Sequence, residues 1–282
     1  MRVANDALTA ESPIEVMLRA GDADALRARL ATDRVHVWSH RLDLDAPVVE
    51  RLRALLAADE IERADRYRFL ADRQRFAVSR AVMRLVLGRY VGCAPALLRF
   101  DYRCACRDPH CSPTRRKPVL AAPDGEPRVQ FNLSHSGTLV VLAVALHDVG
   151  IDVESMRPDV DWRSLADEAL TTSDASLVHG LADEAGRLAF YQGWTRKEAL
   201  LKAMGRGFAA MPDEQPDLLT MDRGARVWAH DGRDYTFVEL AGLPPGHVGA
   251  LVTTGTAPGD AASVHPCDVG TLGQSPLDAA GA

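Results

Sequence analysis

The middle of the chain reads Val149-Gly-Ile-Asp-Val-Glu154, a stretch in which apolar and acidic residues alternate. A period of two is typical of a β-strand, because successive side chains of a strand point to opposite faces. Ile151 and Val153 are therefore predicted to face a core, and Asp152 and Glu154 to share the other face. The Cα atoms of two residues spaced this way lie about 6.5–7 Å apart, so both carboxylates can reach one ligand.

A second stretch, about forty residues further on, reads Trp194-Thr-Arg-Lys-Glu-Ala-Leu-Leu-Lys202. Helical spacing puts Glu198 and Lys202 on one face, four residues apart. If Glu198 joined the two strand carboxylates, the three would repel one another strongly unless a cation lay among them. Oxygen ligands select Mg²⁺ or Mn²⁺ over zinc. Spacing alone favours a simpler interpretation, in which the strand carboxylates face solvent and Glu198–Lys202 is a surface ion pair.

A third stretch, Phe131-Asn-Leu-Ser-His-Ser136, precedes these two and is followed by Gly137. A histidine flanked by hydroxyls and a glycine can offer side-chain and backbone donors to phosphate oxygens. Ser134 and His135 could also suggest a hydrolytic nucleophile and its base. Neighbours in sequence rarely face each other, however, and the G-x-S-x-G elbow is absent, which disfavours the hydrolytic interpretation. A lone Ser-His-Ser triplet is also common by chance.

A long helix is predicted from Asp72 to Tyr90, with Asp72 as its cap and Gly92 as its stop. At 100° per residue its apolar stripe contains Phe76, Met83, Leu87 and Tyr90, and one edge of that stripe carries Arg73, Arg80 and Arg84. Three arginines beside a buried face suit a ligand with several phosphates. The alternative is that they are solvated helix arginines whose stems cover the core.

Together these stretches resemble the signatures of the 4′-phosphopantetheinyl transferases, the superfamily that loads the coenzyme A arm onto carrier proteins. The order of the three motifs and the distance between the first two are also similar to that family. The resemblance covers roughly residues 35–253 and implies the two-lobed type named for the surfactin-synthetase activator. The implied fold is α+β, with two similar α/β lobes that form a pseudo-dimer around an active-site cleft. The implied lobes are residues 34–148, which would bind coenzyme A, and residues 149–254, which would hold the metal.

The resemblance also implies a role for individual residues. The implied ligands of Mg²⁺, with Mn²⁺ as the alternative ion, are Asp152, Glu154 and Glu198. Glu198 is the candidate base for an incoming serine, directly or through water, and Lys202 would stabilise or protonate the leaving phosphate. The implied contacts of coenzyme A are Arg80, Lys117, Ser134 and His135, with Arg75 and Arg84 as weaker candidates. The implied reaction transfers the 4′-phosphopantetheine arm to a serine of an acyl, peptidyl or aryl carrier protein and releases 3′,5′-ADP.

Three short segments depart from the family pattern or stand outside it. Arg116 occupies the position of the glycine in the family's Gly-Lys-Pro motif, so the backbone at Lys117 can differ there. Gly205-Arg-Gly-Phe208 replaces the usual Gly-Lys-Gly-Leu and keeps its charge. Cys104, Cys106, His110 and Cys111 could in principle bind zinc, but their spacing lacks the usual paired knuckles, and we expect substoichiometric zinc.

The composition is that of an ordinary globular chain of one large or two small domains: 282 residues, 47 % hydrophobic and 26 % charged. The longest apolar run, residues 139–146, is far shorter than the ~20 residues of a membrane span, and no basic-then-apolar segment opens the sequence. We therefore expect a cytoplasmic protein. Separately, we expect it to be a monomer. A net charge of −6 without charge blocks argues against nonspecific nucleic-acid binding. Five cysteines predict no disulfide framework.

Both ends are predicted to lack stable packing. Residues 1–33 contain only short apolar pieces and are expected to form a weakly ordered leader. Residues 255–282 consist mostly of Gly, Ala, Pro, Ser and Asp, which cannot bury enough surface to offset ordering entropy, so a disordered tail is expected.

Two other functions stay open. A non-catalytic module that binds coenzyme A or a nucleotide is disfavoured by the complete set of carboxylates. Another Mg²⁺-dependent phosphoryl-transfer enzyme is disfavoured because the sequence has neither a P-loop nor a kinase signature. The pathway is open as well, because siderophore, polyketide, peptide and fatty-acid carrier proteins all present a serine.

Overall fold

The computed structural model describes residues 13–103, 117–121, 129–205, 215–221, 226–255, 261–267 and 272. The helices are α1 (Pro13–Ala20), α2 (Ala23–Asp33), α3 (Ala46–Arg53), α4 (Ala58–Asp65), α5 (Leu70–Val91), η1 (Pro95–Leu97), α6 (Trp162–Ala169), α7 (Thr172–His179) and α8 (Asp183–Ala203). The strands are β1 (Val35–Arg41), β2 (Phe100–Arg103), β3 (Lys117–Leu120), β4 (Gln130–Ser136), β5 (Leu139–Ala145), β6 (Val149–Ser155), β7 (Val227–His230), β8 (Arg233–Ala241), β9 (His247–Thr253) and β10 (Ala261–Pro266).

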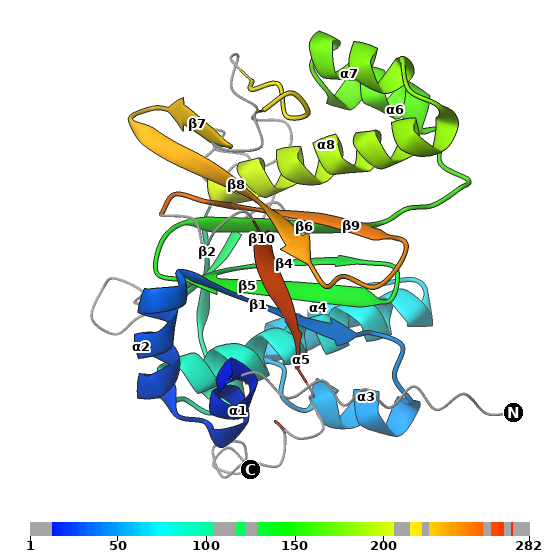
Figure 1. Cartoon of the computed structure of the whole chain (residues 1–282). Helices are drawn as coiled ribbons and strands as arrows, with labels where there is room; N and C mark the ends of the chain where they lie inside the picture. The colour runs from blue at the N-terminus through cyan, green and yellow to red at the C-terminus, as the bar shows by residue number, and fades with distance from the viewer. Residues whose placement is uncertain are drawn as a thin grey trace, which may run out of the picture.

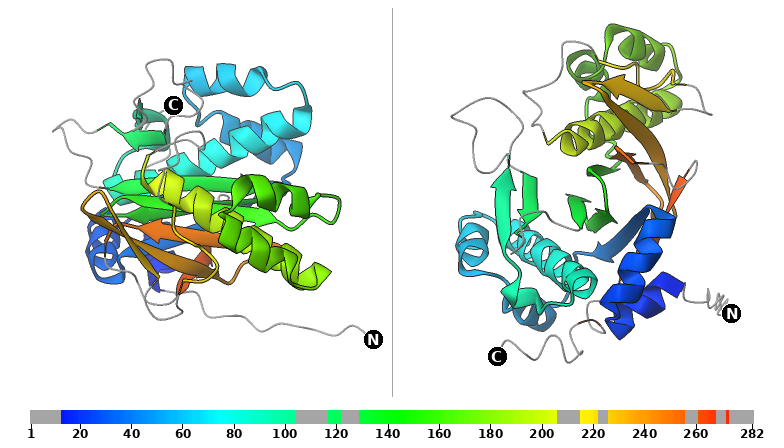
Figure 2. Two further views of the ribbon diagram at one scale, coloured as in Figure 1. Left: turned by 90° about the horizontal axis from the view of Figure 1, so that it is seen from above. Right: turned by 90° about the vertical axis from the view of Figure 1, so that its left-hand side faces the viewer.

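One curled sheet runs through the molecule in the order β4-β5-β1-β10-β8-β9-β6, with β7 paired to β8. Strand β10 is parallel to both of its neighbours, β1 and β8. The sheet curls so far that β4 and β6, at the two ends of this order, meet: the Ile151 N–H donates to Asn132 Oδ1 at 2.9 Å. The right-hand view in Figure 2 shows the curve of the strands. An apolar cluster that includes Val37, Val141 and Ile151 packs among the strands.

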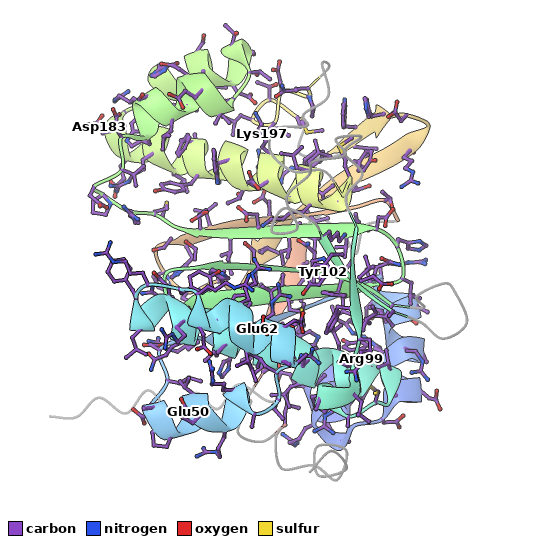
Figure 3. The ribbon with its side chains drawn as sticks, turned by 180° about the vertical axis from the view of Figure 1, so that it is seen from behind. Glu50, Glu62, Arg99, Tyr102, Asp183 and Lys197 are labelled. Atoms are coloured by element: carbon purple, nitrogen blue, oxygen red, sulfur yellow. The ribbon has the colours of Figure 1, made fainter. Side chains whose placement is uncertain are left out.

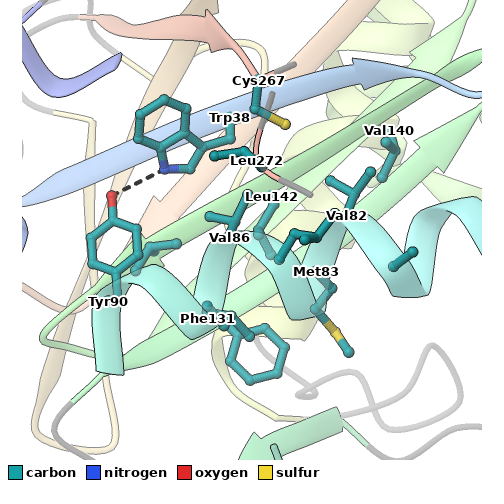
Figure 4. Packing of buried hydrophobic residues seen from close by; sticks show 14 of the residues in the cluster. Trp38, Val82, Met83, Val86, Tyr90, Phe131, Val140, Leu142, Cys267 and Leu272 are labelled. Atoms are coloured by element: carbon teal, nitrogen blue, oxygen red, sulfur yellow. Dashed lines mark hydrogen bonds between the residues drawn. The ribbon is translucent and has the colours of Figure 1, made fainter. Parts of the chain in front are cut away.

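Two long helices cover the sheet from opposite sides (Figure 1). Helix α5 packs against β1, β4 and β5, where Trp38 Nε1 donates to the Tyr90 hydroxyl at 3.0 Å inside the largest apolar cluster (Figure 4). Helix α8 packs against β6 and β9. Figure 3 shows Lys197 of α8 on one side of the strands and Glu62 of α4 on the other. Each half combines a long helix with antiparallel strands, which confirms the expected α+β fold of two similar lobes.

Helix α5 matches the predicted helix closely, since it spans residues 70–91 and ends at Gly92 with φ +65°. Its N-cap is Phe69, so the prediction that Asp72 is the cap was wrong, and Asp72 lies in the first turn instead. There its negative charge still complements the helix dipole. Within the described ranges, no helix is both long and apolar enough to cross a membrane.

The expectation of a weakly ordered leader is wrong for residues 13–33. Helices α1 and α2 bury Leu18, Leu26 and Leu30 in the same cluster as α5, and Asp22 caps α2 by accepting a hydrogen bond from the Ala25 N–H at 2.9 Å. The apolar residues here are too few to stabilise helices alone, but α5 offers them a surface on which to pack. Residues 1–12 lie outside the described part of the chain.

The expectation of a disordered tail is wrong for residues 261–267 and Leu272. Strand β10 lies inside the sheet, and beyond it Cys267 and Leu272 are buried in the α5 cluster. Composition misses this strand because a central strand is held by backbone hydrogen bonds on both edges, which small residues such as Ala262 and Ser263 can make.

Candidate active site

The candidate site lies where β4 meets β6. The described residues of these strands form no backbone ladder with each other. Instead, the oxygens of Asn132, Ser134 and Ser136 accept hydrogen bonds from the backbone N–H groups of residues 151, 153 and 155, at 2.9, 3.4 and 3.0 Å. Because side chains two residues apart share a face of a strand, β4 presents three polar groups in register with the edge of β6.

We call this contact between β4 and β6, made by Asn132, Ser134 and Ser136, the side-chain seam. Asp152 is the most buried carboxylate beside it, with only 4 % of its surface exposed. Its Oδ1 accepts hydrogen bonds from Lys202 Nζ and Ser134 Oγ, both at 2.7 Å. Its Oδ2 is buried and has no hydrogen-bond partner among the described residues. A buried acceptor without a partner is costly, so this oxygen is suited to a donor or cation that arrives with a ligand.

Gly150 allows helix α8 to lie directly on β6. A Cβ atom at this position would stand 2.0 Å from the Ala199 carbonyl oxygen and 2.4 Å from the Ala203 nitrogen, distances that no real side chain adopts. The close contact brings the last turns of α8 beside the strand, where Lys202 Nζ also donates to the Ile151 carbonyl at 3.1 Å. Helix α8 therefore delivers its charged residues to the carboxylates of β6.

The three predicted metal ligands influence one another. Burial and then the charge of Asp152 raise the pKa of Glu154, against hydrogen bonds from Ser136 and Trp194. Burial and the charges of Asp152 and Glu154 also raise the pKa of Glu198, against the attraction of Lys202. In the described chain, however, no three His, Cys, Asp or Glu side chains form a ready metal-binding group. The positive charge in contact with Asp152 is the Lys202 ammonium.

A cavity of about 280 Å³ opens beside this seam. Its walls are formed by Tyr67, Asp72, Arg75, Phe76, His135, Ser136 and Gly137. Desolvation, followed by the positive charges of Lys202, Arg80 and Arg75, lowers the pKa of His135. At His135 these three cations outweigh the opposing charge of Asp152, which favours an anionic ligand. Arg75 is itself paired with Asp72 of the same wall, at 3.0 Å.

Arg80 faces the same region without a carboxylate partner among the described residues. Its guanidinium lies 5.3 Å from the centre of the Phe76 ring, and Nη1 contacts Met83 Sδ at 3.6 Å. Burial lowers the pKa of Arg80, which means that its charge is incompletely compensated. An arginine in this state is suited to bind an anion.

Arg84 has a different position from the predicted one. It is only 2 % exposed; Nε pairs with Glu60 Oε2 at 2.6 Å and Nη1 donates to the carbonyls of Pro95 and Leu98 at 2.8 and 3.1 Å. Helix α5 is covered on this side by α4 and η1, so the border of its apolar stripe lies in the core. The prediction that Arg84 contacts coenzyme A is therefore wrong.

Ser134 also departs from its predicted role. It is buried, and its hydroxyl donates to Asp152 and accepts from Lys202 Nζ at 3.2 Å, so it is engaged by the carboxylate and not by the cavity. Lys117 Nζ donates to the Val149 carbonyl at 2.7 Å, and burial lowers the pKa of Lys117 to about 8. The four-residue cysteine and histidine cluster, Arg116 and residues 206–208 lie outside the described residues.

The sequence was compared with models of protein families and with known proteins. Residues 148–236 match a family model described as the 4′-phosphopantetheinyl transferase superfamily, and residues 47–147 match one described as 4′-phosphopantetheinyl transferase, N-terminal. The chain is 37 % identical over 185 residues to 4′-phosphopantetheinyl transferase HetI of Nostoc sp., over 65 % of this chain and 74 % of that protein. The chain belongs to the 4′-phosphopantetheinyl transferase superfamily. The phosphopantetheinyl transferase of Thraustochytrium sp. is 30 % identical over 250 residues, over 81 % and 82 % of the two chains. The 4′-phosphopantetheinyl transferase of Bacillus subtilis is 25 % identical over 195 residues, over 69 % and 80 %.

Several residues that shape this transferase's site were missed by the sequence analysis. Asn132 and Ser136 complete the side-chain seam, and Gly150 sets the distance between α8 and β6. The period-two repeat of polar residues in β4 was a usable signal. So was the pair Ala199 and Ala203, whose spacing of four residues marks a helix face that can approach a glycine closely.

Proposed function

We propose that this protein transfers the 4′-phosphopantetheine arm of coenzyme A to a serine of an apo carrier protein and releases 3′,5′-ADP, with Mg²⁺ as the required cation. One observation supports the proposal most directly. Near the side-chain seam of β4 and β6, the acidic side chains of Asp152, Glu154 and Glu198 and the ammonium of Lys202 lie beside the cavity that His135 lines. Family membership supports the transfer reaction, and the charges support its electrostatic requirements.

Asp152, Glu154 and Glu198 are the residues that would hold Mg²⁺, or Mn²⁺ in its place. Two observations support this choice: Asp152 Oδ2 is buried without a partner among the described residues, and the charge of Asp152 raises the pKa of both Glu154 and Glu198. Both features describe negative charge that the described residues compensate only in part. When bound, the cation would offset charge on the pyrophosphate of coenzyme A and on the departing 3′,5′-ADP.

The cavity cations would bind the phosphates of coenzyme A. Arg80 has a guanidinium without a carboxylate partner among the described residues, and His135 stands at the cavity wall with Arg75. Lys117 is close to the start of β6 and would add a further positive charge. These contacts would place the pyrophosphate between the cavity and the carboxylates, near Ser136 at the end of β4.

Glu198 is our proposed general base. It would accept the proton of the carrier-protein serine as the serine oxygen attacks the phosphorus that bears the pantetheine arm, and the bond from that phosphorus to the bridging oxygen breaks. The choice of Glu198 rests on its place beside the predicted cation site; burial raises its pKa in the metal-free protein, and a bound cation would lower it. The bridging oxygen leaves with 3′,5′-ADP.

Lys202 would stabilise the negative charge of the leaving phosphate mainly through its own positive charge. An ammonium has three hydrogens, and Lys202 Nζ already has acceptors at Asp152 Oδ1, Ser134 Oγ and the Ile151 carbonyl. Lys202 can donate to the leaving oxygen only by exchanging one of these bonds. The exchange most easily made is the 3.2 Å contact with Ser134, because that hydroxyl keeps other partners.

A single chain contains both halves of this site, so we further propose that the protein acts as a monomer, in the cytoplasm where coenzyme A and carrier proteins are available. The test is to incubate the purified protein with coenzyme A, Mg²⁺ and a panel of apo acyl, peptidyl and aryl carrier proteins and to weigh the products. We expect one added phosphopantetheine arm on at least one carrier. Binding of coenzyme A without modification of any carrier would favour the non-catalytic module.

A further inference from the structure

The side-chain seam contains two serines that contact β6 in the same way. A hydroxyl has one hydrogen to donate and two lone pairs to accept with. Ser136 Oγ accepts from the Ser155 N–H at 3.0 Å and donates to Glu154 Oε2 at 2.6 Å. Ser134 accepts from the next N–H along β6, that of Val153, and donates to Asp152. Each serine therefore joins a carboxylate to the backbone of the following residue.

The two carboxylates differ in what else holds them. Asp152 is bound by the ammonium of Lys202 as well as by its serine. Glu154 has no ammonium in contact among the described residues; its hydrogen bonds come from the Ser136 hydroxyl and the Trp194 side chain. A hydrogen bond of 2.6 Å to a half-buried carboxylate belongs to the strong, charge-assisted kind. The orientation of Glu154 thus depends more heavily on its serine.

Ser136 is also part of the cavity wall, together with His135 and Gly137. It stands at the end of β4, and Gly137, with φ +57°, turns the chain into β5. The backbone N–H of Ser155 fixes the hydroxyl from one side, so the hydrogen of the hydroxyl is directed to Glu154. The residue connects the predicted phosphate site with one of the predicted metal ligands.

We propose that Ser136 is a positioning residue that holds Glu154 in the orientation required for binding the divalent cation. This inference rests on the proposed function, because Glu154 was assigned as a cation ligand there, but cation binding can be measured without the transfer reaction. Ser136 itself touches neither the cation nor the reacting atoms. Without the Ser136 hydroxyl, Glu154 keeps the hydrogen bond from Trp194 but loses the one that directs it from β4, and changes of this kind around metal ligands typically cost about 10- to 100-fold in affinity or activity.

The test compares four full-length variants with the wild type. Ser136→Ala removes the hydroxyl, Ser136→Thr keeps it, and Ser136→Cys keeps a side chain of similar size with a weaker donor. Asn132→Ala is the matched control, because Asn132 makes the same contact with the β6 backbone, to the Ile151 N–H, but donates to no carboxylate that the structure describes. A purely structural seam would make Asn132 and Ser136 equivalent.

The first measurement is calorimetric titration of Mn²⁺ into metal-free protein, with urea unfolding of the same samples. We expect Ser136→Ala to weaken Mn²⁺ binding at least tenfold, Ser136→Cys to weaken it less, and Ser136→Thr to bind almost as the wild type does. Asn132→Ala should lose stability and keep its Mn²⁺ affinity. Equal Mn²⁺ affinities of Ser136→Ala and Asn132→Ala would overturn the proposal. Should the alanine variant not fold, the Cys and Thr variants decide in the same way.

The second measurement is the Mg²⁺ dependence of carrier-protein modification. Ser136→Ala should need at least tenfold more Mg²⁺ for half-maximal rate, with a smaller change in the rate at saturating Mg²⁺. If the wild type modifies carriers and Ser136→Ala needs no more Mg²⁺ than the wild type does, the positioning role is refuted and the proposed function is retained. A wild type that modifies no carrier but loses Mn²⁺ affinity with Ser136→Ala refutes the proposed function and supports the positioning role.

Discussion

Two of the places where the lobes meet, in the part of the chain that the structure describes, are built differently. At the first joint, β10 fills the gap between β1 and β8 with backbone pairing on both of its edges. At the second joint, β4 and β6 are connected by the side chains of Asn132, Ser134 and Ser136. Backbone pairing closes a sheet by using the N–H and C=O groups of the paired strand edges. Side-chain pairing holds two strands together while keeping carboxylates and hydroxyls between them, which is why the candidate site lies at the second joint.

The largest effect is expected from removing the first joint. Deleting residues 258–282 would remove β10, Cys267 and Leu272 and expose the facing edges of β1 and β8. Composition alone predicts no effect of this deletion; the structure predicts a loss comparable to the whole stability of a domain, ~5 kcal/mol or more. Circular dichroism melting curves measure it. A synthetic peptide of residues 258–282 should restore part of the melting temperature, and an unchanged melting curve would show that β10 joins nothing.

The second prediction concerns the charge at the second joint. Asp152→Asn keeps an acceptor for Ser134 and Lys202 but removes a negative charge, so carrier modification should fall by orders of magnitude while coenzyme A still binds through the cavity. Asp152→Ala should in addition lose stability, because Lys202 then loses its charged partner. Asp148→Asn, just before β6, is the control. Near wild-type modification by Asp152→Asn would contradict the metal-ligand assignment.

The third prediction tests the distance between α8 and β6. Gly150→Ala places a methyl group 2.0 Å from a backbone carbonyl, so α8 must shift and carry Glu198 and Lys202 away from Asp152. We expect a loss of about 3 kcal/mol in the free energy of unfolding and at least a tenfold loss of activity. Gly180→Ala is the control, since its methyl group would meet neighbours only at 3.5 Å. Equal melting temperatures for the two variants would contradict this account.

The smallest effect is a pH dependence beside the first joint. His36 on β1 is buried against the Tyr90 hydroxyl at 2.6 Å, and burial lowers its pKa to about 4. Below the ordinary histidine pKa of about 6.5 the unfolded chain binds a proton that the folded chain excludes, so stability falls between about pH 6.5 and 4, by up to about 3 kcal/mol. Urea unfolding at several pH values measures this slope. His36→Gln should flatten it, and a slope that His36→Gln leaves unchanged would contradict this account.

The sequence predicted those helices and strands whose pattern lies within their own residues. Helix α5, its stop at Gly92 and the alternating strand β6 were all readable from periodicity. The side-chain seam was not, because β4 and β6 are the two ends of the strand order and become neighbours only when the sheet curls. Arg84 was misjudged for a similar reason: a helical wheel shows one buried stripe, whereas packing of α4 and η1 buries a second side of α5.

Strand β10 also determines the order in which the molecule can be completed. Its contacts with β1 join residues that are far apart in the chain, such as Ser39 and His265, 226 positions from each other. During synthesis β1, β4, β5 and α5 can assemble early, but the edges of β1 and β8 stay unpaired until residues 261–266 leave the ribosome. Contacts of such long sequence separation form slowly, and open strand edges pair readily with other chains. A nascent chain of this protein is therefore most exposed to aggregation just before β10 emerges.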